Sequence, residues 1–305
     1  MSLNKDHQKA FWSYVGLFFV AFIWGSAFVV VKNALDHVPP SYMVAIRFSI
    51  AAVAMLAIFG KRLKGAGRDT IKHGLTVGFF LFTAYLVQTI GCNHTTAGKN
   101  AFLTAIYIII VPFIHWILDR KKPANRLFVA AIIGLVGIGL ISLDNDLSIG
   151  FGDLLTIICG FLFAMQIAFQ DGYVKKDDPS VICLIEMWVC AVGGWICAPL
   201  IDGALPVSEV TSLSVIGSMV FLGLISSLLC QLLQSVCQKY TKPENASLIM
   251  STESVFGAVC SMLFLHERMS AKVLIGCVIM AGAIVLSQIR FKSETDKVSV
   301  QNKGE

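Results

Sequence analysis

Residues 11–33, FWSYVGLFFVAFIWGSAFVVVKN, decide the fold of this chain of 305 residues. The stretch is apolar throughout, and no charged residue interrupts it before Lys32. A helix of roughly 20 apolar residues is long enough to cross the hydrocarbon core of a bilayer, and the stretch lacks the alternating polarity of a membrane β-strand. It therefore predicts a transmembrane helix.

The same pattern fills the rest of the chain. Cutting at charged, proline-rich or polar breaks leaves nine further apolar stretches: 41–60, 73–93, 100–118, 126–143, 152–172, 180–201, 213–236, 245–265 and 272–290. The chain is 56% hydrophobic and only 14% charged, a composition that excludes an ordinary soluble enzyme. We predict an all-α membrane protein with ten transmembrane helices and almost nothing outside the lipid bilayer.

The formal net charge of +5 does not indicate a nucleic-acid-binding surface, because the basic residues are spread over short loops. Their distribution indicates the orientation of the chain in the membrane instead. If the chain crosses ten times, 19 of the 24 lysines and arginines fall on the side of the N-terminus. By the positive-inside rule that side is the cytoplasm, so both termini are expected there. Short loops and the lack of a targeting segment favour a multi-pass protein of a prokaryotic plasma membrane.

Two parts of the chain share a pattern at an offset of 145 residues. Aligning 98–143 with 243–288 places Asn100-Ala101 on Asn245-Ala246 without a gap. Near the start of each half, Trp24-Gly25-x-x-Phe28 faces Cys159-Gly160-x-x-Phe163. These identities are few, but their order favours a duplication of five helices.

Because five is an odd number, the two copies would be inverted in the membrane. The predicted units are a first repeat at 11–143, a second at 152–290, and a polar cytoplasmic tail at 291–305.

Short motifs in a fixed order carry a family resemblance. They are Trp24-Gly25-Ser26-Ala27-Phe28, Arg47-Phe48, Pro112, Glu253, Leu265-His266-Glu267-Arg268-Met269-Ser270, Gly276 and Gly282. The chain thus resembles the EamA-type members of the drug/metabolite transporter superfamily. The resemblance implies two five-helix bundles around a central cavity, and secondary transport by alternating access.

The chain departs from the family pattern at two positions. Ser254 follows Glu253 where many members have proline, and Lys122 stands where the mirror of Glu267 is expected. These departures weaken any transfer of mechanism by analogy.

Neutral polar side chains recur on shared helix faces, which favours a wet lumen. Single residues of this kind are explained by interhelical hydrogen bonds of about 0.6 kcal/mol, but several on each of three or four faces favour a cavity. The candidate cavity residues are Trp24, Gln88, Asn100, Thr104, Tyr107, Gln166, Gln170, Gln231, Gln234 and Thr252.

Charged groups inside a bilayer are costly, so each is a functional candidate. Glu253 is expected to bind protons or a substrate cation, because desolvation disfavours its charged form; the alternative is a glutamate that only pins two helices. Arg47 and Glu186 occupy corresponding places in the two halves and are candidates for coupling or for a structural ion pair. Pro112 is a candidate hinge.

The predicted function is secondary transport, as an exporter of small polar or amphipathic metabolites such as amino acids, with proton coupling. A channel or a non-transporting membrane scaffold is the alternative. An intramembrane enzyme is a remote third reading, because Gly-x-Ser-x-Gly and His-Glu-x-x-His are absent. The nine cysteines show no metal-ligand spacing and no phosphate-binding loop occurs, so no metal or cofactor is predicted.

Overall fold

The computed structural model describes residues 2–120, 122, 124–143, 149–241, 246, 249–250 and 252–288. Within these ranges the regular elements are helices, apart from one isolated antiparallel bridge between Leu143 and Ile149. The predicted tail at 291–305, and Asn245 of the repeat alignment, lie outside the described residues.

The helices follow the predicted apolar stretches closely. They are α1 Ser2–Ala34, α2 Pro40–Leu63, α3 Arg68–Asn93, α4 Ala97–Thr104, α5 Tyr107–Asp119, α6 Asn125–Ser142, α7 Phe151–Tyr173, α8 Pro179–Ile201, α9 Val207–Val210, α10 Leu213–Val220, the π-helix η1 Phe221–Leu229, α11 Cys230–Tyr240, α13 Thr252–Phe264 and α14 Ala271–Gln288.

Seven helical segments of the described chain are long and apolar enough to cross a membrane, with α4–α5 and α10–η1–α11 each counted as one. Three shorter apolar helices, Asn125–Ile141, Thr252–Phe264 and Ala271–Leu286, occupy the fifth, ninth and tenth predicted spans. The all-helical membrane architecture is therefore confirmed, while a full spanning length is found for seven of the ten predicted helices.

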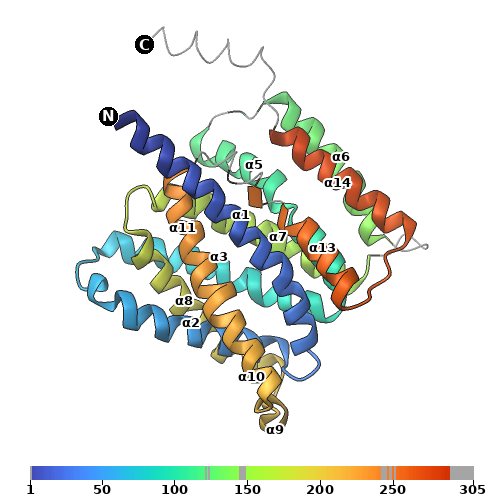
Figure 1. Ribbon diagram of the computed structural model, residues 1–305, viewed down its shortest axis with the longest axis horizontal. Helices are drawn as coiled ribbons and strands as arrows, with labels where there is room; N and C mark the ends of the chain where they lie inside the picture. The colour runs from blue at the N-terminus through green and yellow to red at the C-terminus, as the bar shows by residue number, and fades with distance from the viewer. Residues whose placement is uncertain are drawn as a thin grey trace.

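The helices pack in a pattern that repeats between the two halves of the chain. The α2 helix packs on α8, α3 packs on α7, and α1 packs on α13 and α11. The α6 and α14 helices also pack on each other, and they lie side by side at one edge of the molecule (Figure 1). In the five-plus-five division, α1 corresponds to α7, α3 to α11, and α4–α5 to α13. The α3–α7 pair therefore corresponds to the α11–α1 pair, and the α1–α13 pair corresponds to the packing of α7 on α4 and α5. The packing is therefore duplicated along with the sequence pattern.

Large apolar side chains cover the outside of the bundle. Ile58, Leu135 and Val278 are each more than 60% exposed, and Phe18 and Phe22 project from α1 in the same way. Side chains of this kind on spanning helices are suited to contact with lipid. Amide side chains such as Asn100, Gln166 and Gln231 are buried instead.

Two glycines of the repeated motif allow helix backbones to touch. A Cβ atom on Gly25 of α1 would lie 2.7 Å from the carbonyl oxygen of Glu253 and 2.9 Å from the amide nitrogen of Gly257, both in α13. A Cβ on Gly160 of α7 would lie 3.1 Å from the carbonyl oxygen of Thr104 at the end of α4. In each half the motif thus sets the place of a helix that carries candidate cavity residues.

The fourth predicted span is interrupted, but not at its proline. The helix breaks at Ala105 and Ile106, between α4 and α5, where the backbone forms bonds three residues apart such as Ile106 N to Leu103 O. Pro112 lies inside α5, which continues past it. A hinge at Pro112 stays a prediction; the irregular backbone of this span is at Ala105 and Ile106.

Candidate functional site

A cavity lies where the two halves meet, between α1, α2, α3, α4, α5, α7, η1, α11 and α13. It offers about 50 Å³ to the centres of water molecules. Since one water needs about 10–15 Å³ on this measure, the cavity holds several waters or the polar part of a small solute. Its wall combines aromatic rings with amide, hydroxyl and charged groups.

The structure brings eight of the ten candidate cavity residues to this wall: Trp24, Gln88, Asn100, Thr104, Tyr107, Gln166, Gln231 and Gln234. The other two lie outside it. Gln170 hydrogen-bonds to Gln166 and to the Ser235 hydroxyl, and the hydroxyl of Thr252 donates to the carbonyl oxygen of Ile249 at 2.7 Å within its own helix. Of these bonds only that of Gln170 to Ser235 reaches another helix, α11, and the Thr252 bond is local to its own stretch of chain.

Several wall residues were not among the candidates. Thr89, Cys92, Ser226 and Met250 line the cavity, as do Phe28 and Phe163. The two phenylalanines hold the same position in the repeated Gly-x-x-Phe motif, so the repeat could have identified them. The remaining four carry no distinguishing pattern in the sequence.

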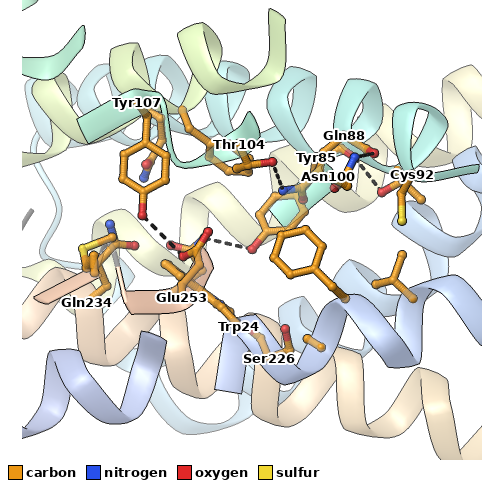
Figure 2. Close-up of a pocket in the computed structure, with 18 of the residues that line it drawn as sticks. Trp24, Tyr85, Gln88, Cys92, Asn100, Thr104, Tyr107, Ser226, Gln234 and Glu253 are labelled. Carbon is orange, nitrogen blue, oxygen red and sulfur yellow. Dashed lines mark hydrogen bonds between the residues drawn. The ribbon is translucent and has the colours of Figure 1, made fainter. Parts of the chain in front are cut away.

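Hydrogen bonds fix one side of the cavity wall. The amide nitrogen of Gln88 donates to the Thr104 hydroxyl at 3.2 Å (Figure 2). The amide nitrogen of Asn100 donates to the Thr156 hydroxyl at 2.8 Å. These bonds join α3, α4 and α7. The bonds orient the amide groups of Gln88 and Asn100 in the wall.

Glu253 is the acidic residue of the cavity wall. Its side chain is only 4% exposed, and its Oε2 accepts a hydrogen bond from the Tyr107 hydroxyl at 3.3 Å. Tyr85 and Tyr107 both point toward this carboxyl group in the close-up of the cavity (Figure 2). The contact of α1 with α13 at Gly25 holds the backbone of Glu253 in this position.

Arg47 brings a guanidinium group to the same cavity. The residue is 2% exposed; its Nε donates to the Ser227 hydroxyl at 2.9 Å and its Nη2 to the Ser226 hydroxyl at 3.2 Å. The guanidinium carbon lies 4.8 Å from the ring centre of Tyr85. Both serines belong to the π-helix η1, and such helices occur frequently at functional sites.

Glu186 lies elsewhere in the bundle. It is fully buried on α8, it is not part of the cavity wall, and neither carboxyl oxygen has a hydrogen-bond partner. Arg47 and Glu186 are both described residues, and no salt bridge joins them. The alternative of a structural ion pair between them therefore does not hold in this conformation, because the two serines of η1 take the guanidinium instead.

A smaller pocket adjoins the cavity on the side of the predicted cytoplasmic loops. It shares Tyr107, Ile167 and Met250 with the cavity wall and adds Asp171 and Gln238. Asp171 accepts a hydrogen bond from Lys175 at 2.6 Å, at the end of α7. Among the residues that the structure describes, no group of three or more His, Cys, Asp or Glu is arranged to hold a metal ion.

Two halves that pack alike around one polar cavity are matched by the family comparison. The sequence pattern of the EamA-like transporter family fits residues 11–143 and, a second time, residues 150–288. This chain belongs to the EamA-like transporter family. The transporter thus contains the family unit twice, and the cavity lies between the two units.

Similar proteins come from archaea and bacteria. The transporter is 28% identical over 287 residues to a protein of Archaeoglobus fulgidus named only as an uncharacterized transporter, covering 94% of this chain and 89% of that one. It is 27% identical over 174 residues to the "probable amino-acid metabolite efflux pump" of Salmonella typhimurium, covering 55% and 56% of the two chains. A solved crystal structure shares the fold with a TM-score of 0.65 at 15% identity, covering 89% of this chain and 94% of its own.

Proposed function

We propose that this EamA-family transporter is a secondary transporter that exports small polar or amphipathic metabolites, such as amino acids, by alternating access. It would act in a prokaryotic plasma membrane with both termini in the cytoplasm, and its two units would be inverted repeats. The duplicated packing of the two halves supports this arrangement. The likeness to a named amino-acid metabolite efflux pump over about half of each chain supports the substrate class.

One observation carries the proposal: a cavity with polar and charged groups in its wall, at the junction of the two units. Among the described residues, the cavity wall holds a single arginine and a single glutamate beside neutral amides, hydroxyls and aromatic rings. A polyanion such as a sugar phosphate would require several cationic side chains, and Arg47 is the cationic residue in the wall. A small solute with little net charge matches this wall best.

Glu253 is the proposed site of proton coupling. A carboxyl group that is almost fully buried binds a proton more readily than one in water. The Tyr107 hydroxyl and the cavity beside it provide contact with both substrate and water. Protonation and release at this carboxyl on opposite sides of the membrane would link solute flux to the proton gradient.

Reconstitution in proteoliposomes tests the proposal. Uptake of a mixture of labelled amino acids is measured with and without an imposed proton gradient, for the wild-type protein and for Glu253→Gln. We expect saturable uptake by the wild type and loss of its proton dependence in the variant. Glu209→Gln is the matched control, because Glu209 is exposed on α9 outside the cavity.

The outcomes separate the two parts of the proposal. Unchanged proton-coupled uptake by Glu253→Gln would contradict the coupling role and leave the transport function standing. Uptake by the wild type that matches empty vesicles for every amino acid would contradict the proposed substrate class.

A further inference from the structure

Arg47 is a buried cation without an acidic partner. Its side chain is 2% exposed, and its hydrogen bonds go to two neutral hydroxyls, those of Ser226 and Ser227. Removing a charged group from water costs several kcal/mol unless an opposite charge compensates it. Within the described chain no carboxylate pairs with Arg47, so the compensating anion is not supplied by those residues.

The guanidinium group is nevertheless held in a fixed orientation. Ser227 and Ser226 of η1 engage Nε and Nη2, while the rings of Tyr85 and Phe48 lie 4.8 Å and 5.3 Å from the guanidinium carbon. Among the described residues Nη1 has no hydrogen-bond partner. Because Arg47 also lines the cavity, a donor is left over beside the space that a ligand would fill.

The π-helix provides this orientation. A Cβ atom on Gly223 of η1 would lie 2.8 Å from the carbonyl oxygen of Arg47, so η1 and α2 are in backbone contact at this point. The contact brings the two consecutive hydroxyls of Ser226 and Ser227 onto the guanidinium. Two neutral hydroxyls position the charge without neutralising it.

Unused acceptors occupy other parts of the same wall. The amide oxygens of Asn100, Gln231 and Gln234 are buried and have no hydrogen-bond partner. A buried oxygen left unpaired is destabilising, so each of these oxygens favours a ligand that can donate to it. Together with Glu253 they form a set that requires donors, whereas Arg47 requires an acceptor.

Tyr85 separates the two kinds of group. Its ring faces the guanidinium of Arg47, and its hydroxyl end points toward Glu253 (Figure 2) and accepts a hydrogen bond from the Gln231 amide nitrogen at 3.5 Å. The cavity therefore has a cationic end and an acceptor-rich end. Arg47 lies at the ring of Tyr85, and the acceptors lie around its hydroxyl.

We infer that Arg47 is the residue that binds a carboxylate of the transported molecule, and that Gln234, Gln231 and Glu253 bind its ammonium group. The inference rests on the proposed transport function and deepens it, because it names the substrate class as small zwitterions with a free carboxylate. A guanidinium offers paired donors that match the two oxygens of a carboxylate. The open Nη1 beside the cavity is the donor available for that contact.

The first test uses the wild-type protein alone and does not depend on any variant folding. Twenty labelled L-amino acids are presented to proteoliposomes, and for each one that is transported the unlabelled acid, its carboxamide and its decarboxylated amine are compared as competitors. We expect the amide and the amine to compete about 30-fold or more weakly than the acid, because each leaves a buried guanidinium unpaired. Amides or amines that compete within about threefold of the acid would overturn the inference and leave transport established.

The second test assigns the discrimination to Arg47. In Arg47→Gln we expect the acid to lose its advantage over the amide, and in Arg47→Lys to keep part of it. Ser226→Ala/Ser227→Ala, which frees the guanidinium without removing it, is expected to reduce the advantage as well. Arg62→Gln is the matched control, because Arg62 lies at the surface and pairs with Asp178 at 3.1 Å.

Each outcome of the second test decides the inference. An acid-to-amide ratio in Arg47→Gln equal to that of the wild type would overturn it. If Arg47→Gln fails to fold, the ratios in Arg47→Lys and in the serine double variant decide instead, and wild-type ratios in both overturn the inference. Absence of flux for all acids, amides and amines in the wild type would overturn the proposed function, and the inference with it.

Discussion

Three ionisable side chains buried in the membrane interior, Arg47, Glu186 and Glu253, have different surroundings, and the differences set their roles. Arg47 and Glu253 line the cavity and have polar neighbours there. Glu186 contacts neither the cavity nor a hydrogen-bond partner. Intramembrane position alone marks all three residues as candidates, but contact with the cavity selects two of them.

Replacing Glu186 is expected to leave transport intact and to raise stability. A buried polar group left without a partner costs about 1–3 kcal/mol, a cost that an apolar side chain of similar volume does not carry. For Glu186→Met we therefore expect a midpoint of thermal unfolding in detergent that is equal to or higher than the wild-type value. Flux should stay within about twofold. A loss of flux in a folded Glu186→Met protein would contradict this assignment and place Glu186 in the transport cycle.

The loop between α7 and α8 should make stability sensitive to acid. Asp177 accepts hydrogen bonds from Thr70 at 2.6 Å and is 2.7 Å from the His73 ring nitrogen. Burial raises the pKa of Asp177, but these hydrogen bonds and the nearby charges outweigh burial, so its pKa lies below the ordinary value of 3.8. The carboxylate thus stabilises the folded protein at pH values above 3.8, and this contribution is lost as pH falls through the lowered pKa.

Asp177→Asn is expected to remove that contribution. The variant should unfold at a lower temperature than the wild type at neutral pH, and the difference should shrink as pH falls below about 4. Asp69→Asn is the control, because Asp69 is exposed and lies 3.9 Å from Lys72. A difference between Asp177→Asn and the wild type that stays constant over this pH range would refute the linkage.

At the scale of helices, backbone contact between α1 and α13 is the feature that locates Glu253. A Cβ on Gly25 would meet the Phe256 Cβ at 2.5 Å and backbone atoms of Glu253 and Gly257 at under 3.0 Å, so even alanine forces the helices apart. We expect Gly25→Ala to destabilise the protein by about 1–3 kcal/mol and to reduce flux more than tenfold. Thermal unfolding and proteoliposome flux measure both effects.

Gly217→Ala is the control for this prediction. Gly217 lies in α10, and a Cβ there would meet no atom within 4 Å. Because alanine favours helix over glycine by about 1 kcal/mol, this variant should be as stable as the wild type or more so. Wild-type stability in Gly25→Ala would mean that α1 and α13 are not in the described contact.

The helices were largely predictable from the sequence, whereas their irregularities were not. Apolar length locates the spans, because the thickness of the bilayer imposes it. The π-helix of 221–229 lies inside a stretch predicted as one continuous helix, and apolar length carries no signal for such a local change of backbone. Likewise, helical spacing placed Gln170 and Thr252 on polar faces but could not tell that hydrogen bonds keep them out of the cavity wall.

At the scale of the whole molecule, the predicted outer ends of the two halves are held together by three charged residues, Lys99, Asp153 and Glu267, which we name the outer latch. Glu267 accepts hydrogen bonds from the backbone nitrogens of Ala97 at 2.8 Å and Gly98 at 3.1 Å. Lys99 pairs with Asp153 at 2.8 Å. Alternating access requires these bonds to break when the cavity opens outward.

Cys92 reports on this opening. Its side chain lines the cavity and is 1% exposed, so it should react slowly with a membrane-impermeant maleimide added outside. Each hydrogen bond to the Glu267 carboxylate contributes about 1.5–3 kcal/mol to the closed state. In Glu267→Ala we therefore expect labelling of Cys92 to accelerate about tenfold or more.

Two controls accompany the labelling. Cys92→Ser should abolish the accelerated signal, and Glu209→Ala, which removes an exposed acid outside the latch, should leave the rate unchanged. Equal labelling rates in Glu267→Ala and the wild type would show that the latch does not control access from this side.

The central claim is that one cavity, open to each side of the membrane in turn, carries a small solute. A counterflow experiment tests this claim most directly. Proteoliposomes loaded with an unlabelled transported amino acid are diluted into buffer that contains a trace of the same labelled compound, without any ion gradient. A carrier that exposes its cavity to one side at a time predicts a transient accumulation of label inside above the external concentration, followed by decay. A channel gives only a monotonic rise to the external concentration, and that result would contradict the account.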